Sequence, residues 1–144
     1  MQLRDLQKKT QGITEFVPLP FVHMEAPIYL RGLARPGPTW RETVLMHSVA
    51  RLVLYPCINN IQTSWVKLGP LGATACLNAG ANDLGGTLMN ETITRSAGAS
   101  HGQEFNPKQM DDLISSAGRK SKQRTTLYGD CLLYTSDAAD DFTS

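Results

Sequence analysis

Apolar and polar positions change spacing along the chain, and the changes predict a helix first and a strand after it. Residues 1–11 have the spacing of the end of a helix, which Gly12 terminates. Residues 13–19 are rich in β-branched and aromatic side chains, which predicts a strand. Pro18 and Pro20 end it, because proline has no N–H to donate to a sheet.

A second helix is predicted over 39–55. Thr39 and Glu42 have the spacing of a capping box, and Pro56 closes the segment. His47 lies close to the apolar stripe, so we expect a structural histidine rather than a ligand. The side chains predicted to be buried recur at helical spacing: Leu45, Val49, Leu52 and Val53.

The rest of the pattern continues the alternation of strand and helix. Strands are predicted over 58–68 and 81–88, with a short helix over 70–79 between them. Asn106 and Gln109 form a second capping box, and they predict a last helix that ends at Gly118. Its predicted buried stripe is Met110, Leu113, Ile114 and Ala117.

This order predicts an α/β fold with about three parallel strands, flanking helices and right-handed crossovers. Three strands cannot close a TIM-type barrel, which needs eight units and about 250 residues. We therefore interpret residues 1–129 as the C-terminal part of such a (β/α) barrel, with the missing part upstream. The long loops 21–38 and 89–105 leave from strand ends, where barrels place their chemistry.

Several polar side chains near those strand ends are candidate binding residues. Gln62 and Ser64 share one strand face, and Asp83 and Thr87 share the inward face of the last strand. Either pair could hydrogen-bond a ligand, but a structural polar pair or a loop cap is the open alternative.

Further candidates are less specific. The pair Gly85 and Gly86 permits close approach of a ligand to the backbone, or only a bend in the strand. Trp65 could stack on an aromatic ring of a ligand. His23 could contact a ligand or shuttle a proton, or it could instead satisfy loop backbone.

Composition narrows the class of protein. The 144 residues suit one domain, and a net charge of +1 gives no field that would attract nucleic acid or an anionic membrane. No apolar run is long enough for a membrane span or a signal core, so we expect a cytoplasmic protein. The three cysteines are widely and irregularly spaced, which predicts no metal site within the chain.

The end of the chain differs from the rest. Residues 130–144 contain four aspartates and no basic residue, and the string resembles translated sequencing-adaptor read-through. We therefore expect a non-native tail and leave it out of the fold. Residues 1–129 then carry 14 basic and 9 acidic residues, a net charge of +5.

Five blocks of sequence resemble the FO synthase family, and more narrowly its tyrosine-using half, the 5-amino-6-(D-ribitylamino)uracil–L-tyrosine 4-hydroxyphenyl transferases. The blocks are TEFVPLPFVH (14–23), RPGPT (35–39), IQTSWVKLG (61–69), GANDLGGTLM (80–89) and QRTTLY (123–128). The resemblance runs from about Leu3 to Gly129 and contains long, distinctive stretches.

This resemblance implies a radical S-adenosylmethionine (radical SAM) barrel with a [4Fe-4S] cluster. Such an enzyme transfers the 4-hydroxybenzyl group of tyrosine to 5-amino-6-(D-ribitylamino)uracil, beside a companion FO-forming radical SAM enzyme or domain. The Cys-x-x-x-Cys-x-x-Cys loop that holds the family's cluster is absent from the sequence. We therefore expect the cluster cysteines upstream, neither cluster nor turnover here, and only part of the substrate wall in this chain.

Three alternatives remain open. A related radical SAM enzyme of futalosine-dependent menaquinone synthesis would have a similar barrel. A phosphate-binding barrel isomerase would use residues 85–87 as an anion-binding loop. An inert truncated fragment would have no activity at all.

Overall fold

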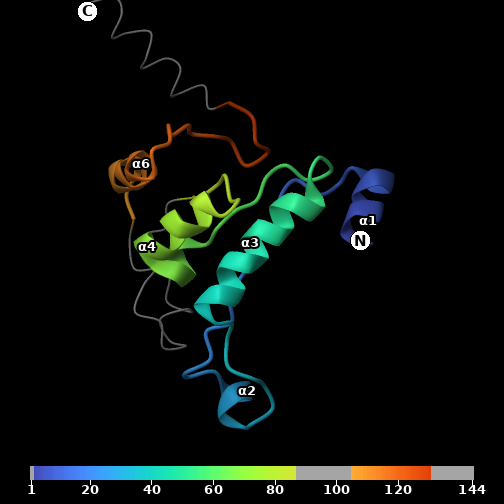
Figure 1. Ribbon diagram of the computed structural model, residues 1–144, viewed down its shortest axis with the longest axis vertical. Helices are drawn as coiled ribbons and strands as arrows, with labels where there is room; N and C mark the ends of the chain where they lie inside the picture. Colours follow the sequence, from blue (N-terminus) through green and yellow to red (C-terminus); the bar gives the residue numbers. More distant parts are fainter. Residues whose placement is uncertain (1, 87–104, 131–144) are drawn as a thin grey trace, which may run out of the picture.

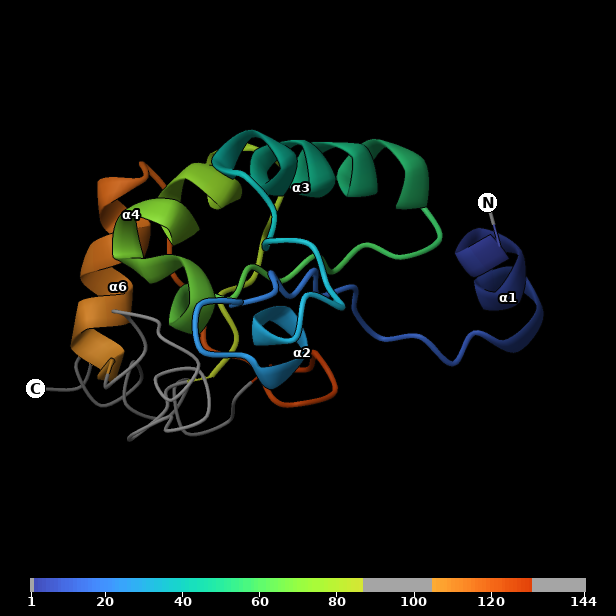
Figure 2. The same cartoon turned by 90° about the horizontal axis from the view of Figure 1, so that it is seen from below.

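A computed structural model describes residues 2–86 and 105–130 of the chain. Helices α3, α4 and α6 lie together, whereas α1 and α2 stand apart from α4 and α6 (Figures 1 and 2). α1 is the predicted N-terminal helix, and α2 is a single turn within the predicted loop 21–38. The helices of these residues are α1 (Gln2–Thr10), α2 (Pro27–Leu30), α3 (Trp40–Leu54), α4 (Trp65–Asn78) and α6 (Pro107–Ser116).

Three extended segments run side by side in the same direction. Phe16 pairs in parallel with Ile61, and Gln62 pairs in parallel with Asp83. The N–H of Gln62 donates to the Phe16 oxygen at 3.0 Å, and the N–H of Thr63 donates to the Asp83 oxygen at 2.9 Å. We call these segments (residues 13–17, 59–64 and 81–86) the ribbon. Parallel bridges thus join the three predicted segments, while the (β/α) barrel to which we assign them stays a prediction.

The extent of the predicted strands is wrong. In the part of the chain that the structure describes, the segments pair through isolated bridges rather than continuous strands. The strand predicted over 58–68 stops at Ser64, because α4 begins at Trp65. Gly69, with φ 70°, interrupts α4, and Pro70 starts its second part. The helix predicted over 70–79 corresponds to this second part of α4. The first part of α4 occupies the residues predicted as the end of the strand.

Helix α3 begins as the sequence predicts. The Thr39 hydroxyl accepts from the Glu42 N–H at 3.2 Å, and the Glu42 carboxylate accepts from the Thr39 N–H at 2.7 Å. This reciprocal pair confirms the capping box, which satisfies two N–H groups at the helix start.

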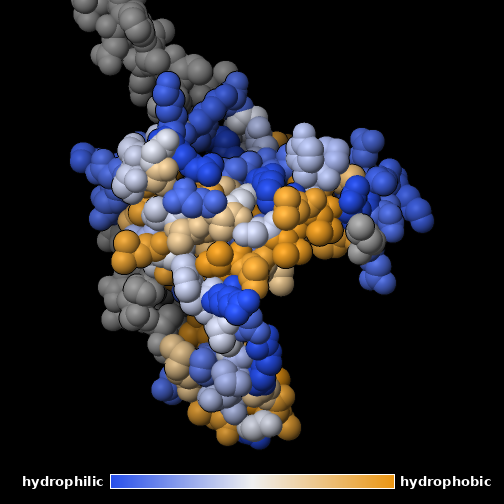
Figure 3. All heavy atoms as spheres, viewed as in Figure 1, coloured by the Kyte–Doolittle hydropathy of each residue, from blue (hydrophilic) through white to orange (hydrophobic). Residues whose placement is uncertain are grey.

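The buried face of α3 is not the predicted one. Leu45, Val49 and Leu52 are 48%, 51% and 79% exposed, so the predicted stripe is wrong. The buried residues of α3 are Thr43, His47, Ala50 and Leu54. Thr43 Oγ1 bonds to the Thr39 oxygen and His47 Nδ1 to the Thr43 oxygen, which offsets part of the cost of burying them. His47 Nε2 has no hydrogen-bond partner among the described residues. The outward stripe leaves apolar surface over α3 (Figure 3).

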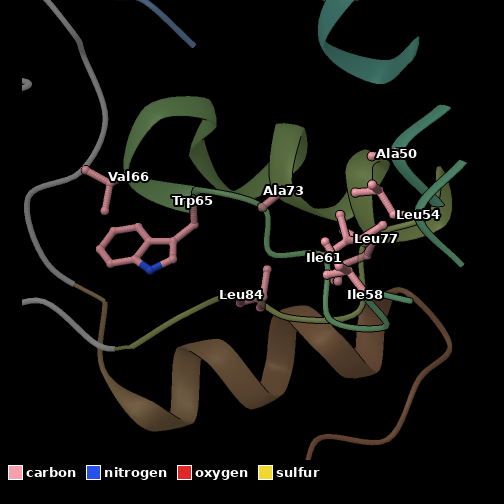
Figure 4. Packing of buried hydrophobic residues seen from close by; sticks show 10 residues of the cluster. Ala50, Leu54, Ile58, Ile61, Trp65, Val66, Ala73, Leu77 and Leu84 are labelled. Atoms are coloured by element: carbon pink, nitrogen blue, oxygen red, sulfur yellow. The ribbon is translucent and has the colours of Figure 1, made fainter. Parts of the chain in front are cut away.

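The core lies between the ribbon and helices α3, α4 and α6. Ile58, Ile61 and Leu77 gather at one end of it and Trp65 lies at the other (Figure 4).

Asn106 and Gln109 cap α6 reciprocally, each accepting at 2.9 Å from the other's N–H, which confirms the second capping box. The predicted stripe of α6 packs against this core and is confirmed: Met110, Leu113, Ile114 and Ala117.

Some expectations fall outside the described residues. These include Thr87, the greater part of the loop 89–105, and residues 131–144 of the predicted tail. Among the described helices, none has the length and apolar character needed to cross a membrane.

Candidate functional site

The face of the ribbon opposite the core carries polar side chains. Glu15, Gln62 and Asp83 come one from each segment, and we call this surface the polar face. A cavity of about 800 Å³ lies along it. Leu77 and Leu84 of the core, helix α6 and the residues that follow α6 also line it. We call residues 119–130 the C-terminal segment.

Asp83 is held by three N–H donors and contacts a phenol hydroxyl that it shares with Glu15. Its Oδ1 accepts from the Gly85 N–H and from Arg124 Nε, both at 3.1 Å. Its Oδ2 accepts from Arg124 Nη2 at 2.5 Å and from the Tyr128 hydroxyl at 2.6 Å. Burial alone would raise the pKa of Asp83, but the bonds from Arg124 and Tyr128 outweigh it and hold the pKa below its usual value.

Tyr128 joins the outer two segments of the ribbon. Its hydroxyl contacts the Glu15 carboxylate as well as Asp83, and its one proton is donated to one of these carboxylates at a time. The Arg124 guanidinium lies 4.0 Å from the centre of the Tyr128 ring, a cation–π contact. Burial, followed by the bonds to the two carboxylates, raises the pKa of Tyr128 well above its usual value. The phenol therefore keeps its proton at neutral pH and acts as a donor.

Glu15 and Gln62 keep hydrogen-bonding capacity toward the cavity. Glu15 Oε2 contacts Tyr128 and lies 3.9 Å from Arg124 Nη2, while Oε1 has no hydrogen bond within residues 2–86 and 105–130. The Gln62 amide also has no hydrogen-bond partner in these residues, and it lies over Gly85. A Cβ on Gly85 would come within 2.3 Å of Gln62 Nε2, so the absence of a side chain there makes room for this amide.

Sequence reasoning found part of this arrangement. Gln62, Asp83, Gly85 and Gly86 were candidates, and all four line the cavity. It did not select the three other members of the network: Glu15, Arg124 and Tyr128. The available signal was that all three lie in blocks that resemble the transferase family.

His23 lies in the loop before α3, outside the lining of this cavity. Its Nδ1 accepts from the Gly37 N–H at 3.0 Å, and its ring meets Tyr29 edge-on at 4.7 Å. Gly37 packs so closely that a Cβ there would lie 2.0 Å from the Phe21 carbonyl oxygen. In this structure His23 orders the loop, which is the alternative that the sequence left open.

Ser64 and Trp65 pack into the protein rather than facing the cavity. Ser64 is buried at the start of α4, where its side chain makes no capping bond. Trp65 is 4% exposed and stacks on Phe105 with ring centres 5.0 Å apart. Its Nε1 donates to the Gly86 oxygen at 3.1 Å. The aromatic ring on which Trp65 stacks here belongs to the protein.

The described residues do not fit the iron–sulfur cluster that the resemblance implies. Such clusters are bound by several cysteine thiolates. Cys76 lies fully buried, and burial raises the pKa of its thiol; Cys57 is half-buried after α3. No three His, Cys, Asp or Glu side chains of the described part gather as metal ligands.

Comparison with known proteins identifies relatives over most of the chain. A FO synthase of Streptomyces coelicolor is 57% identical over 88% of this chain, which corresponds to 15% of that protein. A 5-amino-6-(D-ribitylamino)uracil–L-tyrosine 4-hydroxyphenyl transferase of Methanopyrus kandleri is 55% identical over 92% of the chain and 36% of that protein. A FO synthase of Mycobacterium leprae is 54% identical over 88% of the chain and 15% of that protein.

The chain thus spans between 15% and 36% of the length of these three relatives. No solved structure matches it. The sequence model of one family, described as the CofH/MqnC C-terminal region, matches residues 10–134. Because this match covers most of the chain, the protein belongs to the CofH/MqnC C-terminal region family.

Proposed function

We propose that this chain is the substrate-binding C-terminal part of a 4-hydroxyphenyl transferase. The whole enzyme would join the 4-hydroxybenzyl group of tyrosine to 5-amino-6-(D-ribitylamino)uracil in the synthesis of FO. The observation that carries the proposal is the 55% identity over 133 residues to a relative named for that transfer. The radical chemistry, with its cluster and S-adenosylmethionine, would belong to the rest of the enzyme and to the companion FO-forming enzyme or domain.

A radical SAM β/α barrel is the architecture we propose for the whole enzyme. The ribbon supplies three neighbouring parallel segments, as consecutive barrel strands would. Segments 13–17 and 81–86 are each paired on one side only within the described residues. Further strands on both sides would satisfy these edges, since unpaired strand edges are a liability in an isolated sheet.

The polar face then becomes part of the substrate wall. In a β/α barrel, the face opposite the surrounding helices points toward the barrel interior. Glu15, Gln62 and Asp83 lie on that face, whereas Ile61 belongs to the core beside the helices. Leu84 belongs to that core and also lines the cavity. Carboxylate and amide groups suit two substrates rich in amino, hydroxyl and ring N–H donors.

A related enzyme of futalosine-dependent menaquinone synthesis is the second candidate. It is favoured by one observation, that the matching family joins two names in its description. The two candidates share the barrel and differ in substrate, so a substrate assay separates them.

A graft tests the proposed transfer directly. Residues 10–129 would replace the aligned region of the Methanopyrus kandleri transferase, which aligns with this chain at 55% identity. We expect the reconstituted graft to form the transfer product from tyrosine and 5-amino-6-(D-ribitylamino)uracil. The unaltered transferase is the positive control, and a graft with its cluster cysteines replaced is the negative control.

A folded graft with an intact cluster that forms no product from these two substrates would contradict the proposal. Turnover of a futalosine-derived substrate by the same graft would support the second candidate.

A further inference from the structure

We propose that Arg124 and Tyr128 are positioning residues that fix Glu15 on the cavity wall. Glu15 and the Gln62 amide, rather than Asp83, then bind an amino nitrogen of the substrate. The inference rests on the proposed function, because it concerns the substrates of that same cavity. It differs from the sequence-based prediction that Asp83 could hydrogen-bond a ligand directly.

Asp83 has at most one acceptor position left, and Tyr128 lies against it. A carboxylate offers about four lone-pair positions. The donors that reach Asp83 are the Gly85 N–H, Arg124 through Nε and Nη2, and the Tyr128 hydroxyl. A substrate hydroxyl could bind Asp83 only by displacing one of them. Asp83 therefore acts as the anchor of the C-terminal segment.

Tyr128 is placed by a constrained backbone. Its φ is 64°, a left-handed conformation that is unusual for a bulky residue. The turn is held by the Thr125 N–H, which donates to the Gly129 oxygen at 2.9 Å, and by the Tyr128 N–H, which donates to the Thr125 oxygen at 3.1 Å. Such conformations persist where surrounding contacts hold them. Here the turn places the phenol hydroxyl against Glu15.

The charges around Glu15 favour a substrate group that bears N–H donors. Glu15 and Asp83 carry two negative charges, and the Arg124 guanidinium makes its paired bonds to Asp83 alone, at 3.1 and 2.5 Å. Glu15 Oε2 contacts the neutral phenol, which it shares with Asp83, and lies 3.9 Å from Arg124 Nη2; its Oε1 accepts no hydrogen bond in the described part of the chain. A carboxylate in this position favours a positively charged or N–H-bearing partner. Both proposed substrates supply one, as the α-amino group of tyrosine or the 5-amino group of the uracil.

The test is a double-mutant cycle in the grafted transferase, read as the KM for each substrate and as equilibrium binding by calorimetry. We expect Glu15→Gln to weaken the binding of one substrate by about tenfold or more, as loss of a charge-assisted bond does, with kcat less affected. Tyr128→Phe should weaken the binding of the same substrate by a smaller factor. The double variant should be no weaker than Glu15→Gln alone, because Tyr128 acts through Glu15.

Controls separate positioning from folding. Leu127→Ala alters an 81% exposed neighbour in the same turn and should change neither KM. Arg124→Lys should lose the paired bonds to Asp83. It should weaken the binding of the same substrate that Tyr128→Phe affects. A loss of folding would instead lower the active fraction, and thus kcat, for both substrates. Which of the two substrates responds identifies the source of the amino nitrogen.

The binding measurement tests the roles of Glu15 and Tyr128, whereas the transfer assay tests the proposed reaction. A graft that binds both substrates but forms no product would contradict the proposed reaction, whereas the binding cycle would still decide the inference. The inference is overturned if Glu15→Gln leaves the affinity for both substrates unchanged. It is also overturned if the effects of Glu15→Gln and Tyr128→Phe simply add, or if the graft binds neither substrate.

Discussion

At the scale of single residues, polar contacts between distant parts of the sequence organise the cavity wall. The contact between Tyr128 and Glu15 spans 113 positions, and that between Arg124 and Asp83 spans 41. Neither pair follows from local spacing, because each depends on where the C-terminal segment returns to the ribbon. Gln62 and Asp83 were predictable because strand alternation alone places them on one face.

The acid sensitivity of the chain should depend on Asp83. Its pKa is lower in the folded chain than in the unfolded one, so its contribution to stability is full above the unfolded pKa of about 4. That contribution is lost as the pH falls below about 4 through the folded pKa. Urea unfolding at about pH 6 and about pH 2 should show this loss of unfolding free energy in the wild type. The loss should be smaller in Asp83→Asn. An equal loss in both would contradict the assigned contacts.

The neighbouring glycines provide a matched comparison. Gly85 has φ 77°, and a Cβ there would meet the Gln62 amide, whereas a Cβ on Gly86 would meet nothing within 4 Å. Gly85→Ala should lower the free energy of unfolding by about 1–2 kcal/mol or more, the cost of a left-handed alanine. Gly86→Ala should leave it nearly unchanged. Equal effects in thermal or urea unfolding would show that the Gly85 conformation is wrong.

At the scale of elements, signals confined to a few residues were predictable and burial was not. Both capping boxes follow from a spacing of three residues, and both are present. The buried face of α3 was mispredicted because its outward face is also apolar, and the buried face includes polar Thr43 and His47. A hydrophobic stripe identifies an apolar face, but it does not say which partner covers that face.

Two leucines of α3 test the corrected burial. Leu54 is 5% exposed in the core and Leu52 is 79% exposed. Leu54→Ala should lower the free energy of unfolding by about 2–5 kcal/mol, as removal of a buried leucine does. Leu52→Ala should change it by less than about 0.5 kcal/mol, as surface substitutions do. The reverse ranking in urea unfolding would restore the predicted stripe.

At the scale of the whole molecule, the described chain buries one side of its helices and leaves another apolar. Leu45, Val49 and Leu52 form an exposed stripe on α3. Large exposed apolar patches mark contact surfaces or association hazards. The parallel order of the ribbon was predictable from the alternation of elements, but three segments alone do not determine what closes around them.

The exposed stripe should make the isolated chain associate. We expect its sedimentation coefficient to rise with concentration, because burying the stripe removes apolar surface from water. Replacing Leu45 and Leu52 by lysine should reduce this dependence without lowering the unfolding free energy appreciably. A wild-type chain that stays monomeric at every accessible concentration would contradict the expectation.

The central claim is that the polar face of the ribbon forms a wall of the substrate cavity. A crystal structure of the grafted transferase with tyrosine and 5-amino-6-(D-ribitylamino)uracil bound tests it most directly. The account predicts a substrate nitrogen within hydrogen-bond distance of Glu15 and Gln62, with Asp83 still held by Arg124 and Tyr128. Substrates bound elsewhere, with no atom near Glu15 or Gln62, would contradict it.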